Sequence, residues 1–171
     1  MKAIAIAALF ALAASVAGAA PAAAPSPIFA SATAEVNQSG FLYTTFKEVN
    51  LTGTSVRYLF QADVTATYSC LLNGYASRKA SPPTEDVKQE ALQNTVEMTV
   101  PNNGKLGGGI ALVPIPTDGQ EAACTSSGGT YHLVKVSYSQ IHLWDTSNNI
   151  EADFTSGACA SGACTMFLPG K

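Results

Sequence analysis

The chain has 171 residues, of which 47 % are hydrophobic and only 12 % are charged, and its formal net charge is −3. This charged fraction is about half of the share usual in soluble proteins. Nucleic acids and anionic membranes select clusters of Lys and Arg, so a charge-poor and mildly acidic chain is not expected to bind either of them.

The first residues have the pattern of a secretory signal peptide. Met1-Lys2 precede an apolar run from Ala3 to Val16, and Ala17-Gly18-Ala19 forms a small-x-small cleavage site. The run is too short and too rich in alanine to span a bilayer of roughly 30 Å. We therefore expect residues 1–19 to be removed and the mature protein to be secreted and extracellular.

The segment 20–38 is rich in Ala, Pro and Ser and has no periodicity, so it is predicted to be flexible. The folded domain is expected over residues 39–171. Its first strand is predicted at Phe41–Val49, where a change of parity between Tyr43 and Phe46 suggests a bulge or a bend.

The strongest strand pattern runs from Val56 to Cys70. Every even position is apolar, and the odd positions are polar except for Leu59. Because successive side chains of a strand point to opposite faces, this period of two predicts a long strand with one buried face. Turn residues at Asn50–Gly53 suggest an antiparallel hairpin with the preceding strand, and Leu71–Pro83 is expected to be a loop.

The middle of the chain combines an ambiguous segment with a clear turn signal. Thr84–Leu92 is compatible with a short capped helix or with the start of a strand, and a strand is predicted from about Asn94 to Val100. Asn103-Gly104 is a strong hairpin signal and is expected to join this strand to Leu106–Ile115. The prolines near the end of that second arm predict that it is an edge strand or leaves the sheet there.

A second long strand is predicted at Thr130–Asp145, after a loop at Asp118–Gly129 that carries Cys124. The apolar parity of this strand switches at Ser139-Gln140, which predicts a bulge. A last short strand is expected at Ile150–Phe154. About seven strands separated by turns predict an all-β fold, an antiparallel two-sheet β-sandwich, with a small barrel as the alternative.

Four cysteines in an exported chain predict two disulfides. Three connectivities are possible, and their separations in sequence favour Cys159 with Cys164, which leaves Cys70 with Cys124. The first of these pairs is expected to hold the C-terminal tail. The cysteines are too unevenly spaced for a zinc site, so neither a metal nor a cofactor is expected.

No catalytic constellation is apparent. The chain lacks Gly-x-Ser-x-Gly, and its two histidines, His132 and His142, would lie roughly 30 Å apart along one strand, too far to share an ion. Acidic residues such as Asp63, the Glu85-Asp86 pair and the group at 145–153 form no recognisable glycosidase pair. We expect no enzyme activity, and a secreted hydrolase with an unrecognised active site is the alternative.

The best candidate for recognition is the strand segment from Tyr138 to Asp145. If Ile141 and Leu143 face the core, His142 and Trp144 point outward, and an exposed indole beside polar groups is typical of binding to a glycan or a protein surface. The alternative is a core tryptophan with reversed parity. The candidate binding residues are Tyr138, His142, Trp144 and Asp145.

These observations predict a non-catalytic extracellular binding module for a glycan or a protein surface. Two sequons, Asn37-Gln38-Ser39 and Asn50-Leu51-Thr52, fit the acceptor pattern for N-glycosylation. Asn50 lies at a predicted turn, where a transferase can reach it. We therefore expect Asn50 to be modified if the host is a eukaryote.

A further pattern joins Ala62–Cys70, a proline-bounded segment, Cys124 and Leu133–Tyr138. It resembles a group of small, mostly uncharacterised secreted β-sandwich proteins of actinobacteria and filamentous fungi. The resemblance covers roughly residues 41–154 and implies a sandwich with a bridge between Cys70 and Cys124. It implies no catalytic residues, and the second cysteine pair lies outside it.

Overall fold

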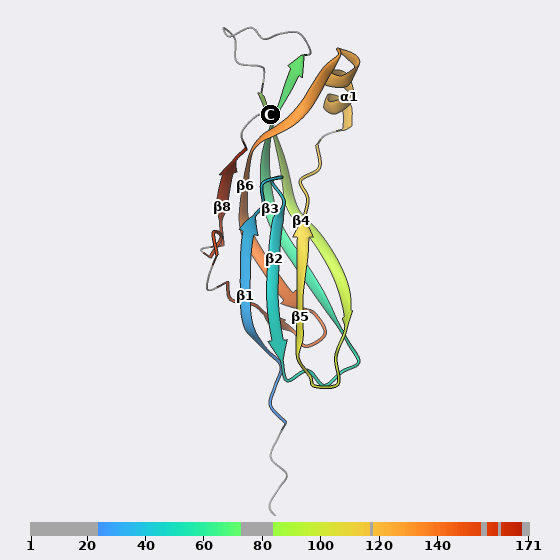
Figure 1. Ribbon diagram of the computed structural model, residues 1–171, viewed down its shortest axis with the longest axis vertical. Helices are drawn as coiled ribbons and strands as arrows, with labels where there is room; N and C mark the ends of the chain where they lie inside the picture. The colour runs from blue at the N-terminus through green and yellow to red at the C-terminus, as the bar shows by residue number, and fades with distance from the viewer. Residues whose placement is uncertain (1–23, 73–83, 117, 155–156, 161, 169–171) are drawn as a thin grey trace, which may run out of the picture.

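The structure is a computed structural model that describes residues 24–72, 84–116, 118–154, 157–160 and 162–168. The predicted signal peptide, residues 1–19, and most of the predicted loop at Leu71–Pro83 lie outside the described residues. The described chain forms two antiparallel sheets and one short helix, and the sheets do not close into a barrel (Figure 1). The prediction of an all-β two-sheet sandwich is therefore confirmed, and the barrel alternative is wrong.

The smaller sheet has three strands and lies in front of the larger one in Figure 1. The strands are arranged in the order β1-β2-β5, with bounds Ile28–Val36, Leu42–Val49 and Leu106–Leu112. The edge position predicted for the strand that begins at Leu106 is confirmed.

The larger sheet has five strands, in the order β4-β3-β6-β7, and β8 pairs with another part of β6. Its two central strands, β3 and β6, are the two long strands that the sequence predicts, and they extend past the smaller sheet toward helix α1 (Figure 1). The bounds are Ser55–Leu72 for β3, Thr84–Thr99 for β4, Gly129–Asp145 for β6, Ile150–Glu151 for β7, Cys164–Phe167 for β8 and Asp118–Ser126 for α1.

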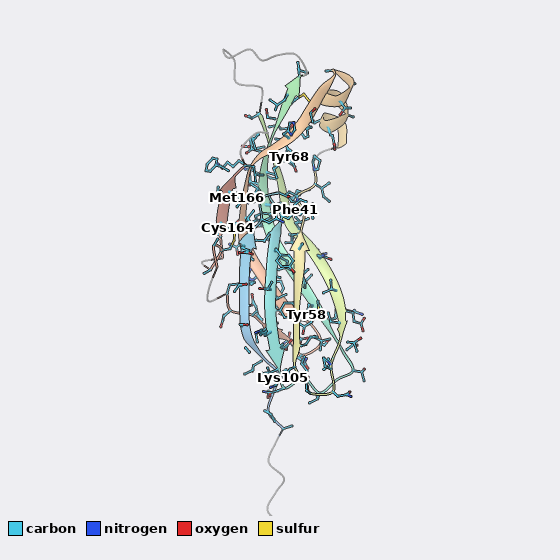
Figure 2. The ribbon with its side chains drawn as sticks, in the orientation of Figure 1. Phe41, Tyr58, Tyr68, Lys105, Cys164 and Met166 are labelled. Atoms are coloured by element: carbon cyan, nitrogen blue, oxygen red, sulfur yellow. A yellow bond between two sulfur atoms is a disulfide. The ribbon has the colours of Figure 1, made fainter. Side chains whose placement is uncertain are left out.

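The even positions of β3 supply the centre of the core, as the period of two predicts. Tyr58 and Phe60 are fully buried, and the ring of Tyr58 lies 4.5 Å from that of Phe46, on β2 of the facing sheet. Tyr68 fills the end of the core near α1, whereas Tyr58 lies toward the opposite end (Figure 2). Burial of these apolar surfaces is the main force that holds the sheets together.

Both predicted hairpins are wrong, because each turn joins strands of different sheets. β2 pairs with β1 and β5, whereas β3 pairs with β4 and β6. The turn that closes with a hydrogen bond from Gly104 N–H to the Pro101 carbonyl likewise leads from β4 to β5 in the other sheet. The two crossings lie side by side, where the Leu51 N–H donates to the Gly104 carbonyl. Turn chemistry sets the local bend but does not determine which sheet the next strand joins.

Three segments differ from their predicted secondary structure, and a fourth, which the sequence left ambiguous, is a strand. The segment 20–38, predicted to be flexible, contains strand β1 at Ile28–Val36, whose inward residues include Ala32 and Ala34. The predicted loop at Asp118–Gly129 contains helix α1. The ambiguous segment from Thr84 belongs entirely to strand β4, while the predicted last strand at Ile150–Phe154 shrinks to two residues.

Bulges shift the register of two strands of the larger sheet and change which side chains face inward. In β6 the register shifts opposite Ala62, and Gln140 adopts a φ of 50°, which confirms the bulge predicted at Ser139-Gln140. In β4 the shift falls at Ala91, where φ is 52°. The Asp63 carboxylate accepts the Ala91 N–H at 2.8 Å, so this side chain stabilises the bulge.

Both predicted disulfides are present. Cys70 is bonded to Cys124, which fastens α1 to β3, and Cys159 is bonded to Cys164 at the start of β8. Gly129 is needed beside the first bridge, because a Cβ there would lie 2.7 Å from the Cys70 sulfur.

Candidate functional site

The outward face of β6 near its end carries the predicted aromatic pair. Ile141 and Leu143 are buried at 5 % and 0 % exposure, while His142 and Trp144 lie on the opposite, outward face and are half-buried. The bulge at Gln140 produces this arrangement by reversing the parity of the strand. The predicted orientation is confirmed, and the alternative of a core tryptophan is wrong.

Neighbouring strands extend this face around Trp144. In the larger sheet Trp144 lies opposite Leu59 of β3 on one side and Glu151 of β7 on the other, and Leu59 lies opposite Thr95 of β4. Residues directly opposite each other in a sheet share a face. We call the surface made by Leu59, Gln61, Gln93, Thr95, His142, Trp144 and Glu151 the Trp144 face.

The rings of His142 and Trp144 are held in place. They stack with their centroids 4.8 Å apart and their planes 11° from parallel. The Nδ1 atom of His142 contacts the Oε1 atom of Glu151, which holds the imidazole at its edge. Beside them, His142 lies opposite Gln61, which in turn lies opposite Gln93. An ordered aromatic pair beside two amides can meet a ligand at a low entropic cost.

Two of the predicted binding residues are not on this face. Tyr138 is 2 % exposed, and its hydroxyl donates to the Gly40 carbonyl at 2.7 Å. Asp145 is fully buried, and its Oδ1 atom accepts the backbone N–H groups of Ser147 and Asn148. The prediction is therefore wrong for both residues, because they share the inward parity of their stretches of β6. Tyr138 holds the turn before β2, and Asp145 closes the turn after β6.

Asp145 also belongs to a buried polar cluster that the predictions missed. Glu48 of β2 is fully buried and accepts a hydrogen bond from the Tyr58 hydroxyl at 2.6 Å. Burial raises the pKa of Glu48 to about 7; the bond from Tyr58 opposes this rise, and the nearby Asp145 carboxyl adds to it. Burial likewise raises the pKa of Tyr58. Neither carboxyl reaches solvent, so the cluster is a feature of the core and offers no route to a substrate.

A signal for Glu48 was present in the sequence. Leu42, Thr44, Phe46 and Glu48 have the same parity, and all four are buried in β2. The parity of the aromatic Phe46 would have placed Glu48 inward.

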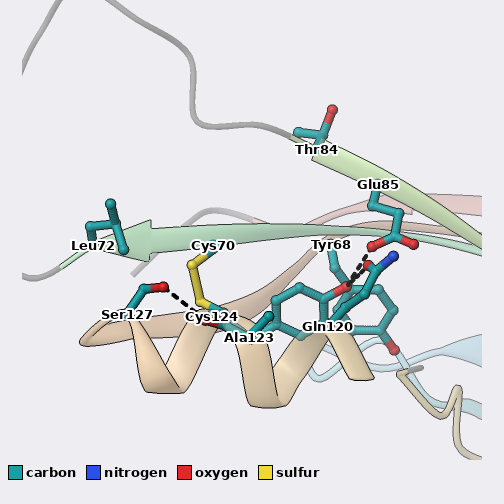
Figure 3. Close-up of a pocket in the computed structure, with 10 residues that line it drawn as sticks. Tyr68, Cys70, Leu72, Thr84, Glu85, Gln120, Ala123, Cys124 and Ser127 are labelled. Atoms are coloured by element: carbon teal, nitrogen blue, oxygen red, sulfur yellow. Dashed lines mark hydrogen bonds between the residues drawn. A yellow bond between two sulfur atoms is a disulfide. The ribbon is translucent and has the colours of Figure 1, made fainter. Parts of the chain in front are cut away.

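A cleft lies beside helix α1, at the far end of β3 and β6 (Figure 3). This α1 cleft has a volume of about 390 Å³. Its walls come from α1 and from β3, β4 and β6, and the side chains of Glu85 and Gln120 approach each other across it (Figure 3). The described lining residues are Tyr68, Cys70, Leu72, Thr84, Glu85, Gln120, Ala123, Cys124, Ser127 and Tyr131.

Tyr131 is the central polar group of the α1 cleft. Its ring stacks on Tyr68 with the centroids 4.9 Å apart, and its hydroxyl lies 3.3 Å from both Glu85 Oε2 and Gln120 Oε1. Burial, assisted by the negative charges of Glu85 and Glu121, raises the pKa of Tyr131, so its hydroxyl stays protonated. The sequence did not reveal the cleft, because its helical wall was predicted to be a loop.

The remaining candidates have structural surroundings. The amide of Asn50 donates to the Ser26 carbonyl at 3.1 Å, and Asn37 is exposed, with its Oδ1 atom accepting the N–H groups of Ser39 and Phe41. Glycosylation of either asparagine stays a prediction. Within the part of the chain that the structure describes, no three His, Cys, Asp or Glu side chains are grouped so as to hold a metal ion.

No family model, curated protein or solved structure matches this chain. Among the described residues, no helix has the length and apolar character needed to cross a membrane. The fold itself, an all-β sandwich of two antiparallel sheets with two disulfides, defines the class of protein but not its activity.

Proposed function

We propose that the protein is a secreted, non-catalytic module that binds a neutral extracellular glycan through the Trp144 face. The observation that carries this proposal is the stacked pair of His142 and Trp144, which points outward from the larger sheet. Disulfides form and persist in oxidising compartments, and the two bridges in this chain suit an extracellular protein.

The composition of the face favours a glycan over a charged ligand. Gln61 and Gln93 present amides that both donate and accept hydrogen bonds, as sugar hydroxyls require. Thr95 adds a hydroxyl, and the only two titratable groups of the face, His142 and Glu151, contact each other. An indole edge bordered by such groups can cover a sugar ring while its hydroxyls find partners.

The test is the variant Trp144→Ala, with binding measured against a panel of neutral polysaccharides and cell walls. Loss of a central aromatic anchor is expected to weaken binding by roughly tenfold or more. The melting temperature should change little, because the indole lies on the outward face. Tyr43→Ala is the matched control, since Tyr43 is 39 % exposed on the smaller sheet, and it should retain full binding.

Two results would refute the proposal. The first is binding that survives Trp144→Ala, or that Tyr43→Ala weakens equally. The second is that the wild-type protein binds no polysaccharide on the panel but binds proteins from cell surfaces. The partner would then be a protein surface, and the proposal of glycan binding would be wrong.

A further inference from the structure

At the centre of the α1 cleft, two acceptor oxygens face the single proton of one phenol. The Tyr131 hydroxyl faces the carboxylate of Glu85 and the amide oxygen of Gln120, each at 3.3 Å. A phenol has one proton, so it can donate to only one of these oxygens at a time, and both contacts are long for an O–H donor. Among the described residues the Glu85 carboxylate has no other hydrogen-bond partner. The cleft can therefore accept a further donor.

Among the residues that the structure describes, the charges that border the α1 cleft have one sign. Glu85 lines it, and Glu121 lies close enough for its charge to act on both Tyr68 and Tyr131. None of the described lining residues is Lys, Arg or His. A concave site bordered by carboxylates concentrates a negative potential, which favours a cation.

The rest of the α1 cleft is apolar and aromatic. The parallel rings of Tyr68 and Tyr131, with planes 6° apart, form one wall, and the Cys70–Cys124 disulfide with Leu72 forms another. Aromatic rings attract organic cations through the negative charge of their faces. A volume of about 390 Å³ lies within the range of known small-ligand sites.

We infer that the α1 cleft binds an organic ammonium group on a small apolar body, with Glu85 as the counter-ion and the tyrosine pair as the aromatic wall. The ammonium donates to the oxygens of Glu85 and Gln120, which the single Tyr131 proton leaves partly unsatisfied. Its source is either a free alkyl- or arylalkylamine or a lysine side chain of a peptide. This inference does not depend on the Trp144 face, which lies toward the other end of β6.

The experiment titrates the full mature protein with phenethylammonium, with the neutral 2-phenylethanol, and with a blocked lysine amide. Calorimetry measures affinity, and backbone amide chemical shifts locate the site. We expect saturable binding of at least one ammonium probe, with shifts centred on Ala123, Gly129 and Tyr131, and much weaker binding of the alcohol. A response to phenethylammonium alone assigns a free amine, and a response to the lysine amide assigns a peptide-borne ammonium.

Two charge-neutralising variants of adjacent residues sharpen the test. Glu85→Gln removes the charge inside the cleft and should weaken ammonium binding roughly tenfold to a hundredfold, the range expected for a charge-assisted hydrogen bond. Asp86→Asn removes the same charge from the outward face of β4, where Asp86 accepts from Thr67, and should leave binding unchanged. Absence of binding by both ammonium probes, equal binding of the alcohol, or equal effects of the two variants would overturn the inference.

Discussion

At the scale of single residues, Glu48 has the surroundings least suited to its type. A buried carboxyl is disfavoured in its charged form, and the pKa of Glu48 rises from 4.5 to about 7. Between these pH values the folded protein binds one proton more than the unfolded chain. The contribution of Glu48 to the free energy of unfolding is therefore largest below about pH 4.5. It falls by on the order of 3 kcal/mol as the pH rises to about 7.

Glu48→Gln is expected to remove most of this decline. The amide can accept the bond from Tyr58 and donate toward Asp145 without titrating, so the variant should exceed the wild type in stability near pH 7. Urea unfolding at several pH values measures the effect. Glu35→Gln, exposed on β1, is the control and should keep the wild-type profile. An unchanged pH profile in Glu48→Gln would contradict the role given to this carboxyl.

Gly129 is the second residue whose type is dictated by its surroundings. A Cβ there would lie 2.7 Å from the Cys70 sulfur and 2.9 Å from the Cys124 sulfur, neither of which can move freely. We expect Gly129→Ala to lower the free energy of unfolding by about 1–3 kcal/mol. Gly119→Ala in α1 meets no atom within 4 Å, and it should be neutral or stabilising by about 0.5–1 kcal/mol. Thermal unfolding of both variants checks the pair, and equal effects would contradict the account.

At the scale of elements, the bulge of β4 holds an alanine in a backbone conformation that favours glycine. Ala91 adopts a φ of 52°, which costs an L-residue with a Cβ roughly 1–2 kcal/mol. Ala91→Gly should therefore stabilise the protein, by about 0.5–1 kcal/mol after the added backbone entropy of glycine. Ala111→Gly in β5, where φ is not positive, should instead destabilise it by a similar amount. Denaturant unfolding should show a higher free energy of unfolding for Ala91→Gly and a lower one for Ala111→Gly. Changes of the same sign would contradict the strain assigned to Ala91.

The sequence predicted β3 and β6 well because both alternate large apolar and polar side chains over many residues. It missed β1 because the inward residues of that strand include Ala32 and Ala34, which give little contrast within an Ala-rich segment. It missed α1 because a nine-residue helix with Gly119, Thr125 and Ser126 has the composition of a loop.

The candidate sites divide in the same way. The outward direction of Trp144 depends on the parity of its own strand. The sequence shows the switch of parity at Ser139-Gln140, but this pattern alone left a core tryptophan as the alternative. The burial of Asp145 beside Glu48 depends on how two sheets face each other, and the α1 cleft depends on a helix folded back over β3. Neither arrangement produces a periodic pattern of apolar and polar residues within a single segment of the sequence.

At the scale of the whole molecule, the two disulfides stabilise unequally. The Cys70–Cys124 bridge closes a loop of 54 residues, and Cys159–Cys164 closes one of 5. On the chain-entropy account, these contribute about 4 and about 2 kcal/mol. The double variant Cys70→Ser with Cys124→Ser should therefore melt well below the double variant Cys159→Ser with Cys164→Ser. Calorimetric scans of both proteins measure this order, and the reverse order would contradict the account.

The central claim, that the Trp144 face meets a neutral glycan, has a direct spectroscopic test, because Trp144 is the only tryptophan of the chain. Tryptophan fluorescence of the wild-type protein therefore reports on this face alone. Titration with an oligosaccharide from a polysaccharide that binds should shift and saturate the emission, with a midpoint equal to the affinity found by calorimetry. Glycan binding detected by calorimetry without any change in tryptophan emission would contradict the claim.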